Sequence, residues 1–230
     1  MAKVDLHTHT RFFHSFTGRR SWFDETGARL LVATARSRGL DAIAVTNHDY
    51  HTEFDFDTGS LTILPGIEVS STDGHLLVVG PDPPEWTNPG EMTPGEVVDL
   101  AHRGECAVIM AHPFRNSRIR EMDVAVDAVE VNGKESRAPE LVPDLAAERG
   151  LPLVGGSDAH FPNEVGRTFT TVDADQVTPE TMVEAIKDDR TGFRVVERPQ
   201  DRYLRRIYDI IHRLRGHTAS RARTSVTGSD

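Results

Sequence analysis

Short apolar runs alternate with helix-length amphipathic stretches along most of the chain. Residues 4–10 and 41–46 are β-rich runs, and residues 24–37 between them place Leu30, Leu31 and Ala35 on one side at helical spacing. This alternation is typical of a fold built from repeated βα units. With 230 residues and no linker that separates two domains, the sequence predicts one sizeable α/β domain.

The remaining helices and strands are predicted from the same alternation of short apolar runs and helix-length amphipathic stretches. Strands are predicted at 61–69, 75–79, 107–111, 125–131, 151–154 and, as the last one, 168–172; helices are predicted at 93–103, 139–149 and 178–188. The first and third of these helices open with Thr-Pro, a capping residue followed by a proline at the first helical position. Residues 50–60 show no helical period, so we expect one helix of the repeat to be missing there.

The C-terminal part differs from the rest in charge. Residues 198–223 contain eight arginines and two aspartates, a local net charge of +6. Because the whole chain has a net charge of −10, the rest of the chain carries −16. We expect a barrel domain over 1–197, followed over 198–230 by a basic amphipathic helix and a disordered tail. The apolar stripe of that helix favours packing on the barrel or on a second copy of the chain. A nucleic-acid surface is the less favoured partner, because runs of charged residues are usually solvated faces.

The composition indicates a globular protein. Apolar residues make up 37% and charged residues 27% of the chain, and no apolar run is long enough to span a bilayer, so no membrane partner is expected. No secretion signal is visible. The one cysteine, Cys106, lies in an apolar run and reads as a buried thiol in a reducing compartment, so we expect a cytoplasmic protein.

Histidine and acidic residues gather at the ends of the predicted strands. His7 and His9 are two residues apart on the first strand and therefore project to the same face, where two imidazoles suit a divalent transition metal. Five other candidate ligands lie at or just past the ends of later strands: His48, Glu68, His112, Asp158 and His160. A sixth, His75, lies at the start of its strand. Any one of them could be a hydrogen-bonded core residue. Because the carboxyl ends of barrel strands meet at one mouth, the set together predicts a metal centre.

Six motifs in this order resemble those of the PHP superfamily, which is named for polymerase and histidinol phosphatase. They are Asp5-x-His7-x-His9, Thr46-Asn-His48-Asp49, Gly66-Ile-Glu68, His75-Leu-Leu, Ala111-His112-Pro113 and Gly156-Ser-Asp158-Ala-His160. The resemblance covers about residues 3–172. It implies a distorted seven-stranded (β/α)7 TIM-like barrel that holds two or three divalent metals (Zn, Mn or Fe) and hydrolyses phosphoesters.

The resemblance also implies which residues bind metal. Nine residues match the family's ligands: His7, His9, Glu68 and Asp158 for a first metal, Glu68 as a bridge with His75 and His112 for a second, and His14, His48 and His160 for a third. His14 lies in a loop that varies within the family. Asp158, His160 and Glu68 are the expected catalytic residues. His51, His102, His212 and His217 match no motif and are expected at the surface.

The expected function is hydrolysis of a phosphoester of a small metabolite or nucleotide by a metal-activated hydroxide. Arg115, Arg167 and Lys134 are candidates to bind the phosphate, although each could equally be a solvated surface charge. An alternative is a barrel that serves as a subunit or nuclease in nucleic-acid processing. The amidohydrolases share the barrel and the His-x-His strand, but the bridging lysine they usually require has no counterpart here.

Overall fold

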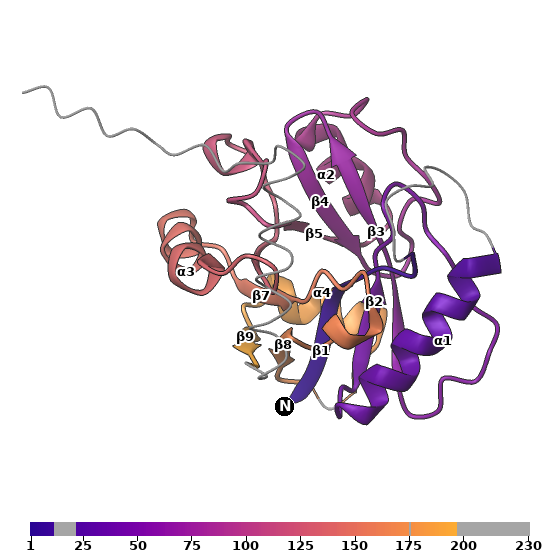
Figure 1. Ribbon diagram of the computed structural model, residues 1–230. Helices are drawn as coiled ribbons and strands as arrows, with labels where there is room; N and C mark the ends of the chain where they lie inside the picture. The colour runs from indigo at the N-terminus through magenta and orange to yellow at the C-terminus, as the bar shows by residue number, and fades with distance from the viewer. Residues whose placement is uncertain (12–21, 175, 197–230) are drawn as a thin grey trace, which may run out of the picture. The chain divides into compact units, whose positions relative to one another are not determined.

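Nine strands in one sheet carry the fold in the computed structural model, which describes residues 1–11, 22–174 and 176–196 (Figure 1). The strands are β1 (Ala2–Thr8), β2 (Ala42–Val45), β3 (Thr62–Ser71), β4 (Gly74–Val79), β5 (Ala107–Met110), β6 (Ala128–Asn132), β7 (Leu153–Gly156), β8 (Thr168–Val172) and β9 (Thr191–Val195). The helices are α1 (Trp22–Ser37), α2 (Pro94–Arg103), α3 (Ala138–Arg149) and α4 (Pro179–Lys187). All of them belong to one compact unit, Met1–Val196.

The sheet is mixed and almost closes into a barrel. Its order is β7-β6-β5-β4-β3-β2-β1-β8-β9, with antiparallel pairs at β3–β4, β4–β5, β1–β8 and β8–β9. The segment just past β7 returns to β1, where the His9 amide donates to the Ala159 carbonyl at 2.8 Å. The predicted α/β barrel in a single unit is therefore present, but its predicted count of seven strands is not confirmed.

A tight turn explains one of the antiparallel pairs. β3 runs through Pro65 and Gly66 without a break and is joined to β4 by the two residues Thr72 and Asp73. Gly74 follows the turn at φ 147°, and a Cβ atom there would lie 2.5 Å from the Ser117 hydroxyl. Only glycine fits this position, and the short turn leaves no room for a crossover helix.

The last strand departs from the sequence prediction. Residues 168–172 were expected to be the final strand, yet α4 is followed by β9, which pairs antiparallel with β8. The prediction was wrong because β9 is only partly buried and includes Gly192 and Arg194, so it lacks the apolar run that marks the other strands. The predicted helices otherwise match α1 to α4 closely, and residues 51–60 contain no helix, as expected.

The barrel interior is apolar away from the candidate ligands. Val4, Leu6 and Leu77 project into it from the strands, and α4 adds Met182 and Ile186 to the same cluster. Cys106 is buried in a second cluster, as predicted. No helix of the described residues is both long and apolar enough to cross a membrane. The predicted basic helix, the tail and the boundary at residue 197 lie outside or at the edge of the described residues and stay predictions.

Candidate metal centre

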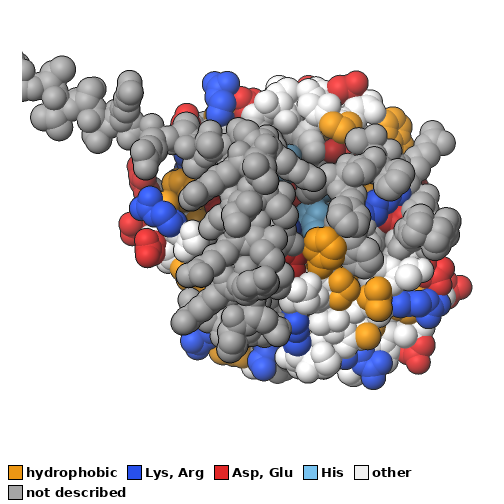
Figure 2. All heavy atoms as spheres, in the orientation of Figure 1, with side chains coloured by type: hydrophobic (Ala, Val, Ile, Leu, Met, Phe, Trp, Pro, Cys, Tyr) orange, Lys and Arg blue, Asp and Glu red, His pale blue; other side chains and the backbone are white. Residues whose placement is uncertain are grey.

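The candidate ligands that the structure describes gather in one cluster near the strand ends. Eight of the nine lie in the described residues, and the ninth, His14, lies outside them. Histidine atoms, pale blue in Figure 2, are visible on one face of the molecule, and the side chains of His48 and His75 are 29% and 34% exposed. The cluster can therefore be reached from solvent.

Glu68 lies at the centre of the cluster and is 1% exposed. Its Oε2 atom is 3.1 Å from His7 Nε2 and 3.3 Å from His9 Nε2. The same oxygen is 3.1 Å from His48 Nδ1. One carboxylate oxygen thus faces three imidazoles, which come from β1, from the residue just past its end and from the loop after β2.

The second oxygen of Glu68 faces a different pair of imidazoles. Oε1 lies 2.7 Å from His75 Nδ1 and 3.0 Å from His112 Nε2. A carboxylate with its two oxygens directed at separate groups of nitrogen donors has the arrangement of a ligand that bridges two metal ions. The bridging role that the sequence resemblance implied for Glu68 fits this geometry.

Asp158 supplies the second carboxylate, from the loop after β7. Its Oδ1 atom is 3.5 Å from His9 Nε2 and 3.8 Å from His7 Nε2. Both Asp158, at φ 52°, and His112, at φ 28°, have left-handed backbones. Such strained conformations in non-glycine residues cluster at functional sites, where the surrounding structure holds them in place.

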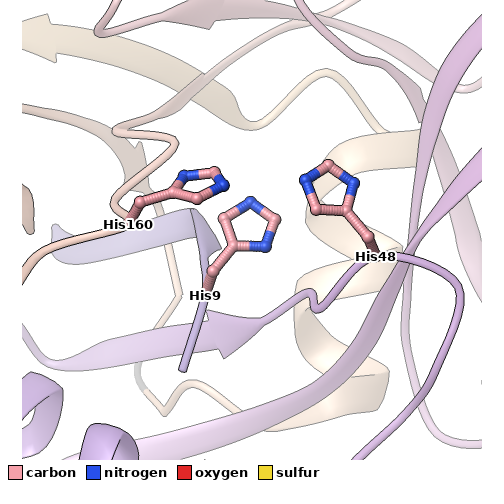
Figure 3. A group of neighbouring side chains, drawn as sticks. All are labelled: His9, His48 and His160. Carbon is pink, nitrogen blue, oxygen red and sulfur yellow. The ribbon is translucent and has the colours of Figure 1, made fainter. Parts of the chain in front are cut away.

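Three groups of side chains place one donor atom each within 4.8 Å of one another. They are His9, His48 and His160; His7, His9 and Asp158; and His48, Glu68 and His75. Figure 3 shows the first group, whose three imidazoles approach one another from three different segments of the chain. His48 belongs to two groups, whereas the family resemblance implied it as a ligand of the third metal only.

The unpaired nitrogen atoms in the cluster fit a bound cation. His9 is 1% exposed, and neither of its ring nitrogens makes a hydrogen bond within the described part of the chain. His112 Nδ1 likewise has no hydrogen-bond partner there. Because a buried polar atom without a partner is costly, a metal ion that accepts these lone pairs would remove the penalty. Imidazole and carboxylate donors together suit zinc, iron and manganese.

The electrostatics keep several donors deprotonated, which is the form that binds metal. Burial, and then the neighbouring His160, hold the pKa of His9 well below its usual value. Burial alone would raise the pKa of Glu68, but His48 and His7 hold it well below its usual range. In the same way Lys134 and Arg115 outweigh burial and hold the pKa of Asp158 low.

Glu130 is a site residue that the sequence reasoning missed. It is fully buried on β6, and its Oε1 lies 2.7 Å from His7 Nδ1. Its Oε2 accepts hydrogen bonds from the His112 amide at 2.9 Å and from the Asn132 side chain at 3.0 Å. Glu130 therefore orients His7 and fixes the start of the His112 loop. An acidic residue inside the apolar run Val129–Val131 was the available signal.

Asp5 supports the site from the other side of His7. It is fully buried and accepts hydrogen bonds from the amides of His7, Ser157 and Gly166 at 3.3, 2.9 and 2.7 Å. These bonds tie β1 to the segment that carries Asp158. Burial raises the pKa of Asp5 to about 6.

Two of the three candidate phosphate ligands lie in the cluster. Arg115 Nη2 is 2.5 Å from Asp158 Oδ2, and Lys134 Nζ is 3.3 Å from Asp158 Oδ1 and 2.8 Å from His160 Nδ1. Arg167 is different: it is 1% exposed, and its Nη1 lies 4.0 Å from Glu164 Oε1. Its burial leaves no surface with which to contact a substrate directly.

The two described histidines that matched no motif, His51 and His102, lie outside the three groups of donors. His102 is on the surface, as expected, where its Nε2 is 2.9 Å from Asp127 Oδ2. His51 was also expected at the surface, but its side chain is only 12% exposed and its Nδ1 lies 3.1 Å from the Gly66 carbonyl. His212 and His217 lie outside the described residues.

Sequence comparison gives one partial match. A family model described as PHP-associated matches residues 138–191, a segment that runs from α3 to the start of β9. No curated protein sequence matches the chain.

Structure comparison gives several long matches at low identity. PsfC from Pseudomonas syringae PB-5123 has a TM-score of 0.69 at 18% identity, over 91% of this chain and 98% of that one. The lesion-specific endonuclease EndoQ from Pyrococcus furiosus has a TM-score of 0.60 at 18% identity, over 84% of this chain and 57% of that one. A protein from Bifidobacterium adolescentis, assigned as a metal-dependent phosphoesterase, has a TM-score of 0.54 at 18% identity over 80% and 95%. At this identity the likenesses show a shared fold.

Proposed function

Because the chain is a PHP-superfamily protein, we propose that it is a metal-dependent phosphoesterase that hydrolyses a phosphoester of a small metabolite or nucleotide. The six motifs, the PHP-associated segment and the shared barrel support the family. One observation carries the proposed activity. Glu68 directs one oxygen at His7, His9 and His48, and the other at His75 and His112, as a carboxylate shared by two metal ions would.

The proposed cofactors are two or three divalent ions of zinc, manganese or iron. When bound, such ions activate water for attack on phosphorus and neutralise the charge that develops on the phosphate. The donors divide as follows: His7, His9 and Asp158 for one ion, His75 and His112 for a second that shares Glu68, and His48 and His160, with His14, for a third. Glu68, Asp158 and His160 are the proposed catalytic residues.

Arg115 and Lys134 are the proposed phosphate ligands. Both cations face the Asp158 carboxylate, and the side chain of Arg115 is 31% exposed and so accessible to a ligand. A guanidinium can bind two phosphate oxygens at once, while a lysine ammonium acts as a point charge. Arg167 is left out of this proposal because it is buried beside Glu164.

A second candidate is a role in nucleic-acid processing, as a nuclease or as a subunit of a larger complex. Its support is the fold shared with the lesion-specific endonuclease, which this chain matches over 57% of that protein's length. Hydrolysis of oligonucleotides in preference to small phosphoesters would favour it.

The experiment is a hydrolysis screen with purified, metal-replete protein. Phosphomonoesters, nucleotides and cyclic phosphates are tested alongside short DNA and RNA. The Asp158→Asn protein should lose at least about 100-fold in kcat while its melting temperature stays close to that of the wild type, because the change removes a ligand charge rather than core packing. Asp144→Asn, at an exposed position of α3, is the matched control. Equal turnover by the wild type and Asp158→Asn would contradict the proposed site.

A further inference from the structure

An exposed tryptophan lies on a loop that pairs with the segment just after His48. Trp86 is 63% exposed, and within the described part of the chain only Met1 and Leu30 are comparably exposed large apolar residues. Leaving an indole in water forgoes the stabilisation that burial of a large apolar side chain gives. A residue of this kind near a catalytic site therefore suggests contact with a ligand.

The loop that carries Trp86 is held in place by backbone hydrogen bonds. The His51 amide donates to the Glu85 carbonyl at 2.7 Å, and the Thr87 amide donates to the Asp49 carbonyl at 3.0 Å. These two bonds flank the antiparallel pair of Tyr50 and Trp86. In such a non-hydrogen-bonded pair the Cα atoms are about 4.5 Å apart and the side chains lie on the same face. Trp86 is thus fixed beside Tyr50 although it is exposed.

Asp49 connects this loop to the metal ligands. Its Oδ1 accepts hydrogen bonds from the Thr87 hydroxyl at 2.9 Å and from the Ser70 amide at 2.8 Å, and its Oδ2 accepts one from the Ser70 hydroxyl at 2.7 Å. Asp49 directly follows His48, and Ser70 stands two residues after Glu68. One carboxylate therefore links the segments of two candidate ligands to the loop that presents the indole.

Tyr50, the residue that pairs with Trp86, combines an aromatic ring with a neighbouring cation. The Tyr50 ring is buried, and its hydroxyl donates to Asp24 Oδ1 at 2.6 Å. The Arg11 guanidinium lies 4.7 Å from the centre of the same ring. Arg11 follows His9 by two residues, so the chain connects this cation directly to a candidate ligand.

We propose that Trp86 is a stacking platform for a planar ring in the alcohol part of the phosphoester substrate. The inference rests on the proposed function and narrows its substrate class to ring-bearing phosphomonoesters, such as aryl phosphates and nucleoside monophosphates. In this arrangement the phosphate binds at the candidate metal centre, and the ring of the substrate stacks on the exposed indole of Trp86. Stacking of a ring on an aromatic side chain changes binding by about 10-fold or more.

Specificity kinetics test the proposal in metal-replete protein. The measured quantity is the ratio of kcat/KM for adenosine monophosphate to that for glycerol phosphate, which has no ring. Trp86→Ala should lower this ratio about 10-fold through a higher KM for the nucleotide, and Trp86→Phe should restore most of it. Leu30→Ala, which removes another exposed apolar side chain from α1, is the control and should leave the ratio unchanged.

Fluorescence provides a readout that does not depend on turnover. The chain has two tryptophans, so in the Trp22→Phe protein the emission comes from Trp86 alone. Adenosine should quench this emission saturably, and glycerol should leave it unchanged. If a 5′-phosphorylated oligonucleotide quenches the Trp86 emission at a much lower concentration than adenosine does, the ring that stacks on Trp86 is a base at the end of a nucleic-acid strand.

The outcomes separate this inference from the proposed function. If both phosphoesters are hydrolysed and the ratio is the same in Trp86→Ala as in the wild type, stacking is overturned and the phosphoesterase proposal stands. If no phosphoester is hydrolysed, the proposed function fails, and saturable quenching by adenosine then supports the ring site alone. Absence of quenching by adenosine overturns the stacking proposal.

Discussion

At the scale of single residues, the candidate site depends on groups that hold the ligands as much as on the ligands themselves. Glu130 shows this most clearly, because one carboxylate contacts the His7 ring and the His112 amide. An imidazole whose second nitrogen is bound to a carboxylate has a fixed orientation and a more basic ligand nitrogen. Removal of the Glu130 carboxylate should therefore weaken metal binding, although Glu130 is not itself a candidate ligand.

Glu130→Gln should lower the affinity for metal about 10-fold to 100-fold. The reason is that a neutral amide replaces the carboxylate beside His7 Nδ1, so the ring is held less firmly and is less basic. Metal titration of the apo protein measures the change, and excess metal should restore activity. Glu140→Gln, an exposed change on α3, is the control. Unaltered metal affinity in Glu130→Gln would count against this role.

Asp5 should give the protein a distinctive dependence of stability on pH. Its pKa is raised by burial to about 6 in the folded state, from 3.8. Between these values the folded protein binds the proton more tightly than the unfolded chain, so the contribution of Asp5 to stability falls as pH rises through this window. The change amounts to about 3 kcal/mol, since one pKa unit corresponds to about 1.4 kcal/mol.

Urea unfolding of the metal-free protein at pH 4, 5, 6 and 7 measures this effect. The difference in free energy of unfolding between the wild type and Asp5→Asn isolates Asp5 from the other carboxylates. The wild type should lose stability relative to Asp5→Asn as pH rises from 4 to 6, and the difference should level off above pH 6. A difference that is constant over the whole range would show that Asp5 does not titrate there.

At the scale of elements, the loop after β5 shows how a strand end is shaped to present a charged residue. Arg120 donates to the carbonyls of Pro113 and Ser117, at 2.9 and 2.5 Å, and so spans the turn that contains Arg115. Its guanidinium also lies 5.6 Å from the centre of the Phe114 ring. The turn therefore keeps its shape through a side chain that hydrogen-bonds to its own backbone.

Arg120→Ala should raise KM for a phosphoester several-fold, with a smaller effect on kcat. The released turn would no longer hold Arg115 against Asp158, and the proposed phosphate contact would weaken. Arg118→Ala is a close control, because Arg118 is 79% exposed in the same loop. Equal KM values for the two variants would mean that Arg120 does not position Arg115.

The sequence predicted most elements because their signals are local. Thr93 and Glu96 form the capping box that begins α2, and Gly150 ends α3 in a left-handed conformation, so both boundaries can be read from neighbouring residues. The existence of β9 depends on pairing with β8, from which it is separated in sequence by α4. No local period encodes that pairing, and β9 is too exposed to stand out.

The site was predictable to a similar extent. Strand ends that carry His or acidic residues could be read along the chain, and eight of those residues meet in the described structure. Residues that act through others were missed, as Glu130 was, because a buried acid has no spacing signature of its own. Arg167 was proposed from its nearness to His160 in sequence, and only the folded chain shows that it is buried.

At the scale of the whole molecule, Met1–Val196 forms a compact unit by itself. All nine candidate ligands fall within these bounds, and all but His14 belong to the described residues. The remaining residues carry the basic segment, whose proposed role is packing on the barrel or on a second copy of the chain. Nucleic acid is the less favoured partner.

Truncation after Pro199 should leave specific activity on a small phosphoester within about twofold, because the proposed chemistry resides in the barrel unit. Stability or oligomeric state should change, as size-exclusion chromatography with light scattering and thermal unfolding would measure. Binding of DNA or RNA that weakens with salt and disappears on truncation would instead favour the nucleic-acid role.

The metal content of the protein tests the central claim most directly. After metal-replete expression and dialysis, elemental analysis should find two or three equivalents of zinc, manganese or iron per chain, and Glu68→Gln should lose at least one of them. The shared carboxylate is the reason, since both groups of histidines depend on its two oxygens. Less than one equivalent in the wild-type protein would contradict the account.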